Sequence, residues 1–285
     1  MNNICKAIFF SLLVSTVSLL TFTSCEHEID YDYPSVETIV VFDGQISNED
    51  LFVRISRSRP MSDSTKNHWV DNAQVWITNN EGKEEQLIYD KSDCSYRSST
   101  GLIGIPGHTY NMRATVDGHQ YEATTTMQQA ARIDTVFFRY IKVFHERMFF
   151  VCVRGEDPAS GELSPCLCRL MRRGEVFRWT PRTGRSSMNG SFEYDVPCST
   201  ESAMDDGVDE EGKTPLMDGD TLTLVIMTID KQCSEYFSSL MISESTTTNP
   251  LSNIRGGAQG IFMAANITRA EPIVFNKEAV LNNKE

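Results

Sequence analysis

The sequence predicts an all-β protein with one short helix, and three observations support this fold class. Apolar and polar residues alternate with a period of two in several short segments, turn-forming residues stand between them, and a single segment has helical spacing. The 285 residues, 40% of them hydrophobic, leave room for two modest domains. We expect an N-terminal immunoglobulin- or transthyretin-like β-sandwich, followed by a second β-sandwich or barrel-like domain.

Residues 1–24 have the features of a signal peptide rather than of a folded element. Lys6 is the only charged residue before Glu26, and the apolar run over residues 7–24 is too short and too rich in serine and threonine for a stable membrane span. Small residues directly precede Cys25, which resembles the cleavage site of bacterial lipoproteins. This resemblance implies cleavage before Cys25 and acylation of Cys25, and an ordinary secretory signal is the alternative. Several acyl chains together would anchor the protein firmly to a membrane.

Residues 25–36 are expected to form an acidic tether. Four acidic residues and no basic residue fall between Glu26 and Asp32, so the segment cannot bury enough apolar surface to fold. It resembles the acidic export signal that follows the lipidated cysteine of Bacteroidota lipoproteins, which implies display on the outer face of the outer membrane. The alternative is a spacer that serves only solubility.

Residues 37–128 are expected to form the N-terminal β-sandwich domain. Alternation is clear in residues 51–57, 73–78 and 110–116, each with one apolar and one polar face, as in half-buried antiparallel strands. Asp117-Gly118 joins the last of these strands to the next. A type I′ turn needs positive φ at both central residues, which Asp-Gly supplies, so we predict a hairpin about this pair.

Residues 129–285 are expected to form the C-terminal β domain. Strands are predicted over residues 134–138, 148–153 and 220–229, and hairpins through residues 155–161 and 173–175. A helix is predicted over residues 231–243, lying across a sheet or closing one end of a barrel. Its apolar positions recur at three- and four-residue steps: Cys233, Tyr236, Phe237, Leu240 and Met241.

Four segments, in their order and spacing, resemble one protein family across nearly the whole mature chain. They are residues 39–46, 55–60, 72–75 and 249–262, and the last, Asn249-Pro250-Leu251-Ser252-Asn253-Ile254-Arg255-Gly256-Gly257-Ala258-Gln259-Gly260-Ile261-Phe262, is the most distinctive. The sequence resembles the Bacteroidota lipoproteins that carry domain of unknown function 4249 (DUF4249). The resemblance implies a role beside TonB-dependent outer-membrane receptors, as an accessory to uptake. It implies no catalytic residue, because the family has no established one.

The charge of the chain excludes one class of partner. A net charge of -13 would repel a phosphate backbone, so nucleic acid is not expected as a partner. An anionic membrane surface would not attract the body either, and the lipid must provide the anchor.

The sequence contains no recognisable catalytic or metal-binding motif. Its five histidines include no HExxH pattern, and no GxSxG elbow is present, so we expect neither an enzyme nor a cofactor. The acidic residues 205–212 do not match the spacing of a calcium-binding EF-hand loop and are interpreted as a solvated surface loop. Gly256, Gly257 and Gly260 lack the lysine of a phosphate loop and are expected to allow a bend or close backbone packing.

An arginine-rich segment is the candidate contact for a ligand or partner. Its members are Arg169, Arg172, Arg173, Arg178, Arg182 and Arg185, with Trp179 among them. Arg172, Arg173, Arg178 and Trp179 are the candidate contact residues, because guanidinium groups bind carboxylates and phosphates bidentately and stack on planar groups. The alternative is that the arginines face the acidic residues 201–211 and balance charge within the domain.

Two covalent modifications are also predicted. Six cysteines after Cys25 allow 15 complete disulfide pairings. A hairpin about residue 160 would place Cys152 opposite Cys168, which makes this pair the candidate disulfide, and buried free thiols are the alternative. Ser64, in Asp63-Ser64-Thr65, resembles the Bacteroidota O-glycosylation pattern and lies in a predicted loop.

Together these features predict a non-catalytic outer-membrane surface lipoprotein, accessory to a TonB-dependent receptor in nutrient uptake. An adhesin or fimbria-associated surface lipoprotein is the first alternative, and a surface hydrolase is the second. The sequence does not point to a particular ligand.

Overall fold

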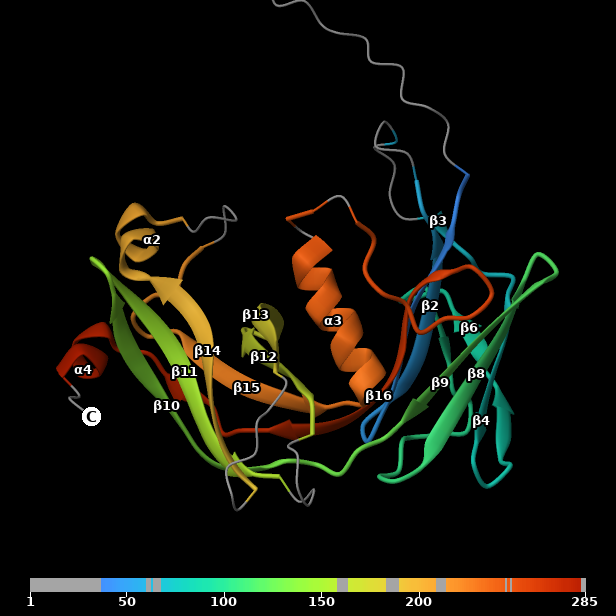
Figure 1. Cartoon of the computed structure of the whole chain (residues 1–285), viewed down its shortest axis with the longest axis horizontal. Helices are drawn as coiled ribbons and strands as arrows, with labels where there is room; N and C mark the ends of the chain where they lie inside the picture. Colours follow the sequence, from blue (N-terminus) through green and yellow to red (C-terminus); the bar gives the residue numbers. More distant parts are fainter. Residues whose placement is uncertain are drawn as a thin grey trace, which may run out of the picture. The chain divides into compact units, whose positions relative to one another are not determined.

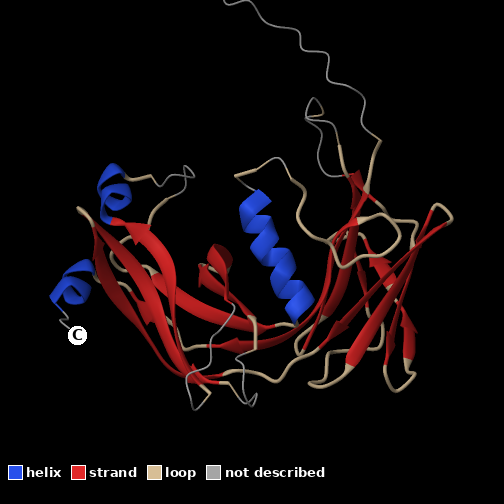
Figure 2. Ribbon diagram, in the orientation of Figure 1, coloured by secondary structure: helices blue, strands red, loops and turns tan. Residues whose placement is uncertain are grey.

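A computed structural model describes residues 37–282, apart from 60–62, 64–67, 158–163, 183–189, 209–213, 244 and 247. Cys25, Ser64, the signal peptide and the tether therefore lie outside the described residues. Within the described part, seventeen strands form three sheets and three helices accompany them, which confirms the all-β fold class (Figures 1 and 2). None of the described helices has the length and hydropathy needed to cross a membrane.

The largest sheet contains ten strands and joins the two ends of the described chain. Its main order is β13 (Glu175–Arg182), β12 (Cys166–Arg172), β15 (Thr221–Thr228), β16 (Gln259–Arg269), β1 (Val40–Ser47), β2 (Leu51–Arg57), β7 (Ser95–Arg97) and β6 (Ile88–Asp90), with β17 (Ile273–Val274) beside β15 and β3 (His68–Trp69) beside β2. β1 and β16 are parallel, with Val41 opposite Gln259, and the other pairs in this sheet are antiparallel.

Two smaller antiparallel sheets complete the strands. One has the order β5 (Glu84–Gln86), β4 (Gln74–Asn79), β8 (Thr109–Val116) and β9 (His119–Thr126), and the other has the order β10 (Arg132–Val143), β11 (Glu146–Glu156) and β14 (Ser191–Thr200). The predicted hairpin about Asp117-Gly118 is confirmed, because β8 pairs with β9. The φ angles of 49° at Asp117 and 84° at Gly118 are both positive, as a type I′ turn requires.

Strand β16 contributes to two separate hydrophobic cores because successive side chains of a strand point to opposite faces. Phe262 and Ala264 pack into the core between the N-terminal strands of the large sheet and the four-stranded sheet. Ile261, Met263 and Ala265 pack into a second core, between the large sheet and the helix over residues 231–243. The predicted domain boundary at residues 128–129 stays a prediction.

The predicted helix is confirmed as α3 (Lys231–Ser243). Cys233 and Phe237 are buried on its inner face, where they pack against the large sheet. Two further helices, α2 (Glu201–Asp206) and α4 (Lys277–Asn282), were not expected. With six residues each, they are too short to produce a recognisable apolar period. The two ends of α2 do carry a sequence signal. Thr200 caps the first turn, and Gly207, with a φ of 75°, ends the helix.

One of the two hairpins predicted in the C-terminal half forms, and the other does not. Arg173-Gly174 joins β12 to β13 as expected, with positive φ at both residues. The hairpin through residues 155–161 is wrong. Among the described strands, β11 pairs with β10 and β14, whereas β12 pairs with β13 and β15. Long-range pairing places the two strands in different sheets.

Candidate binding cleft

A cavity of about 920 Å³ lies where three segments of the described chain meet. The end of β9, the first turns of α3 and the segment before β16 line it. Its lining residues are Thr124, Thr125, Thr126, Gln128, Asp230, Lys231, Gln232, Glu235, Tyr236, Leu251, Ser252, Asn253, Ile254 and Arg255. We call this cavity the polar cleft, because hydroxyl, amide and charged side chains dominate the lining.

Asp230 fixes the position of α3 relative to β9. One carboxylate oxygen accepts the backbone N–H of Cys233 at 2.9 Å, which caps the start of the helix. The other accepts the Thr125 hydroxyl at 2.7 Å and the Thr126 backbone N–H at 3.0 Å. Because the three contacts occupy both oxygens, this carboxylate acts as a fixed structural element of the cleft wall.

Thr125 extends the same connection to the large sheet. Its hydroxyl donates to Asp230 and accepts the backbone N–H of Ala264, in β16, at 2.9 Å. The residue is only 2% exposed, so these bonds are shielded from water. A single buried side chain therefore connects β9, β16 and, through Asp230, the start of α3, at one side of the polar cleft.

The opposite wall is the segment that is most distinctive in the sequence. The Asn253 side chain donates to the Phe262 carbonyl at 2.8 Å and accepts the Phe262 N–H at 3.0 Å, so it bonds β16 as a neighbouring strand would. Arg255 makes two backbone hydrogen bonds with Glu122 of β9, at 2.7 and 3.2 Å. Leu251 donates its N–H to the Ser239 hydroxyl of α3 at 2.8 Å. The segment is thus attached to all three neighbouring elements.

The chemistry of the polar cleft is that of hydrogen bonding with balanced charge. Lys231 and Arg255 bring two positive charges, and Asp230 and Glu235 bring two negative charges. Tyr236 is half-buried, and burial, with a smaller contribution from Asp43, raises the pKa of its hydroxyl, which therefore stays protonated at neutral pH. Histidine and cysteine do not occur in the described lining. Such a surface is suited to binding a polar ligand.

The predicted arginine contact residues do not form one patch. Arg172 is held by Asp220 at 3.1 Å and by the carbonyls of Pro215 and Thr214, and only 17% of its side chain is exposed. Arg173 is 87% exposed and lies 3.8 Å from the Asp220 carboxylate. Together with Arg269, Arg173 lines a second cavity, of about 650 Å³.

The other two candidate contact residues lie on different faces of β13. Arg178 stacks over the Phe177 ring, with its guanidinium carbon 4.4 Å from the ring centroid. Trp179 packs against Phe237 of α3, at 6.0 Å between ring centroids. In the described structure, the acidic Glu201 pairs with Arg147 and Lys277. Residues 209–211 of the acidic stretch lie outside the described residues, so charge balance within the domain stays a prediction. Of the four predicted contact residues, Arg173 is therefore the one whose side chain is exposed.

The candidate disulfide does not form in the structure. The six described cysteines, Cys94, Cys152, Cys166, Cys168, Cys198 and Cys233, are free thiols. The pairing of Cys152 with Cys168 depended on the hairpin about residue 160, and the two residues instead lie in different sheets. Cys168 is close to Cys166, with 3.9 Å between their sulfur atoms.

Cys152, Glu193 and Asp195 form a group whose ligand atoms lie within 4.8 Å of one another, as a metal site requires. Two arginines already neutralise the carboxylates: Arg139 contacts Glu193 at 2.5 Å and Asp195 at 3.3 Å, and Arg154 contacts Glu193 at 2.6 Å. The thiol donates a hydrogen bond to Asp195, and burial and this carboxylate raise its pKa. A protonated thiol beside two guanidinium groups is a poor cation site.

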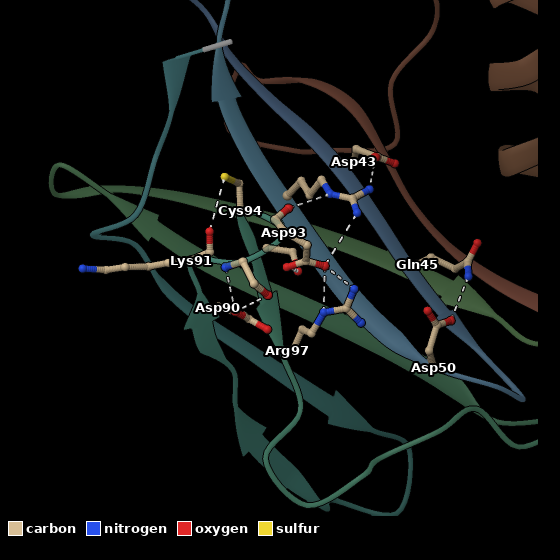
Figure 3. A network of polar contacts seen from close by, with 11 residues as sticks. Asp43, Gln45, Asp50, Asp90, Lys91, Asp93, Cys94 and Arg97 are labelled. Atoms are coloured by element: carbon tan, nitrogen blue, oxygen red, sulfur yellow. Dashed lines mark hydrogen bonds and ion pairs between the residues drawn. The ribbon is translucent and has the colours of Figure 1, made fainter. Parts of the chain in front are cut away.

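A charged network lies across β1, β2 and β7 of the large sheet (Figure 3). Arg54 lies between Asp43, at 3.5 Å, and Asp93, at 3.7 Å, and Arg97 also binds Asp93. The Phe52 ring lies beneath both guanidinium groups, 4.8 and 5.8 Å from their central carbons. Hydrogen bonding to Arg97 lowers the pKa of Asp93, which keeps it ionised. Arg54 and Arg97 balance the charges of Asp43 and Asp93, and their contacts connect β1, β2 and β7.

The polar cleft does not coincide with the arginine segment that the sequence indicates as a candidate contact. The segment 249–262 is distinctive in the sequence, whereas Thr125 and Asp230 carry no comparable signal. Asp230 directly precedes the predicted helix, and an aspartate at this position is a typical helix cap. This signal predicts the cap but not the contact with Thr125, which lies far away in the sequence.

The fold and the cleft define an all-β protein with a polar surface site. The chain belongs to the family described as "Domain of unknown function (DUF4249)", whose model matches residues 26–271. No curated protein matches the chain. Solved structures similar to it include the selenomethionine-substituted chicken interferon gamma receptor alpha chain, which is 10% identical and has a TM-score of 0.19, with 68% of this chain and 89% of that chain covered. A likeness this distant carries no argument about fold or function.

Proposed function

We propose that the protein is a non-catalytic lipoprotein of a Bacteroidota cell surface, anchored to the outer membrane through Cys25. In this proposal it is an accessory to a TonB-dependent receptor in nutrient uptake, and the polar cleft binds the ligand that is passed on. The observation that carries the proposal is that residues 251–255, within the most distinctive segment of the sequence, line one wall of the polar cleft.

The chemistry of the polar cleft favours binding over catalysis. The Asp230 carboxylate has both oxygens in hydrogen bonds to the protein, so it is poorly placed to act as a general base. Glu235 and Lys231 are exposed, and they lie 3.9 Å apart as an ion pair on the helix surface. Neither charged group is enclosed away from water, as a general acid or base in a closed catalytic site would be.

The tether limits where a receptor can be contacted. A lipid at Cys25 and about ten following residues allow the folded body to move at most about 35 Å from the membrane surface. Contact with a partner must therefore occur close to the membrane, as expected for an accessory of an outer-membrane receptor.

Affinity purification from outer membranes tests this function. A C-terminally tagged chain, solubilised in mild detergent, is expected to recover a TonB-dependent receptor. The Cys25→Ala variant should lose both incorporation of a palmitate analogue and the membrane fraction. Recovery of pilin subunits instead would support an adhesin, and equal labelling of Cys25→Ala would contradict the lipid anchor.

A further inference from the structure

The edge of β9 inside the polar cleft points to the class of ligand. β9 is the outer strand of the four-stranded sheet, so one side of its backbone has no strand partner along its length. Both the N–H and the carbonyl of Glu122 bond to Arg255, and they therefore point away from β8. In a strand, groups two residues apart point the same way, so the backbone groups of Thr124 also face outward, into the cleft.

Hydrogen bonds within the protein occupy the outer backbone groups of β9 on both sides of Thr124. Before it, Glu122 is paired with the Arg255 backbone, and after it, the Thr126 N–H is held by Asp230 at 3.0 Å. Among the described residues, the N–H and the carbonyl of Thr124 have no hydrogen-bond partner. One donor and one acceptor, in the arrangement of a strand edge, are thus presented to whatever enters the polar cleft.

The course of residues 253–255 explains why the outer edge of β9 is unpaired at Thr124. Continuing the antiparallel bridge from Arg255 and Glu122 by two residues would bring Asn253 beside Thr124. Asn253 instead bonds Phe262 of β16 with its side chain, at 2.8 and 3.0 Å. The segment therefore leaves β9 at this point, and the polar cleft lies in the gap between them.

We propose that the polar cleft binds an extended peptide segment, which adds to β9 through main-chain hydrogen bonds to Thr124. This inference rests on the proposed function, since it names the ligand class of the same cleft. Main-chain bonds give a peptide its affinity for a strand edge, and side-chain contacts give it selectivity. The guanidinium of Arg255 has no ion-pair partner within the described residues, so an acidic side chain on the peptide is favoured next to Arg255.

A proline substitution separates main-chain from side-chain contributions. Thr124→Pro removes the N–H that faces the cleft, and proline is tolerated on an edge strand where that N–H has no partner in the sheet. Thr124→Ala is the matched control, because it keeps the N–H. Both variants lose the bond that the Thr124 hydroxyl accepts from Asn111, at 3.1 Å, so any difference between them comes from the backbone.

The probe is a library of capped random octapeptides, selected on lipid-free chain that begins at residue 26. Selected peptides are expected to be enriched in acidic residues and to bind Thr124→Pro about tenfold more weakly than Thr124→Ala. In the wild type, the Thr124 amide should become protected from hydrogen exchange when the peptide is added. This second measurement needs no variant to fold.

Three results would overturn the inference: no peptide is selected, the selected peptide binds Thr124→Pro as tightly as Thr124→Ala, or the Thr124 amide stays unprotected in the complex. A glycan array that yields a ligand for the cleft while the octapeptides yield none would assign a different ligand class. Recovery of the receptor by affinity purification does not depend on these outcomes, so a failed peptide selection is distinguishable from a failed receptor function.

Discussion

Gly260 lies so close to Phe42 that a Cβ at position 260 would be 1.9 Å from the Phe42 carbonyl oxygen. The φ angle of Gly260 is +100°, a conformation that residues with side chains rarely adopt. The contact occurs where β16 runs parallel to β1, with Phe42 opposite Gly260 in the register. The prediction that glycine here allows close backbone packing is confirmed.

Gly260→Ala should therefore destabilise the protein severely, by about 4 kcal/mol or more in the free energy of unfolding, because a backbone clash adds to the strain of positive φ. Gly257→Ala is the control. It has a φ of +87° but nothing within 4 Å of its Cβ, and should cost only about 1 kcal/mol. Urea unfolding of the lipid-free chain measures both, and equal losses would contradict the clash.

Charge reversal at the two neighbouring arginines should have very different effects. Arg172→Glu would place a carboxylate beside Asp220, which is 8% exposed, and should lower the free energy of unfolding by about 3 kcal/mol. Arg173→Glu, at a side chain that is 87% exposed, should change it by less than about 0.5 kcal/mol. Thermal or urea unfolding tests this difference. Arg173→Glu is consequently the variant with which to test an arginine contact to the receptor.

Glu85 should make stability depend on pH. Burial opposes its ionisation, but hydrogen bonds from Thr100, Ser98 and Ser99 outweigh burial and hold the pKa below its ordinary value of 4.5. A carboxyl whose pKa is lowered by folding stabilises the protein above its unfolded pKa, and this stabilisation disappears as the pH falls through the folded pKa.

Glu85→Gln should therefore cost about 1–3 kcal/mol at pH 7, and the cost should shrink below pH 4.5. The neighbouring Glu84→Gln is the control, since Glu84 makes an exposed ion pair with Arg113 and should cost less than about 1 kcal/mol. Urea unfolding at a series of pH values measures both variants. A cost of Glu85→Gln that does not change with pH would contradict the lowered pKa.

The six described cysteines should behave as protected thiols. Cys94 is partly exposed, whereas the other five are buried. Since the thiolate is the reactive form, and burial raises the pKa of Cys198 to about 12, alkylation of the native protein at pH 7.5 should label Cys94 first. Mass spectrometry without reductant should find six labels after unfolding. Four labels would instead indicate a disulfide.

The fold can be predicted from the sequence where residues close together in the chain determine the local structure. Asp117-Gly118 encodes its turn through backbone conformation alone, and the apolar spacing of residues 231–243 identifies a helix against a sheet. The hairpin between β11 and β12 was wrong because both strands find better partners elsewhere: Cys152 lies opposite Asp195, and Cys168 lies opposite Ile226. No local pattern encodes such pairings.

The same limit applies to the candidate site. Asn253 belongs to a segment that is recognisable in the sequence, but its function in the cleft depends on Phe262 and on the course of β9. Thr125 and Asp230 form their hydrogen bond only after three elements have packed together. Each residue alone is ordinary in sequence, and the site arises from their placement.

The parallel pairing of β1 with β16 has a consequence for how the chain reaches its native state. β1 lies at the start of the described chain and β16 near its end. The pairing of β1 with β16 therefore cannot form until almost all of the polypeptide is available. Contacts between distant residues slow folding, and an unpaired strand edge invites association with other chains in the meantime. In the exported lipoprotein that we propose, the edge of β1 should therefore stay unpaired, and open to association with other chains, until residue 259 and its successors have also crossed the inner membrane.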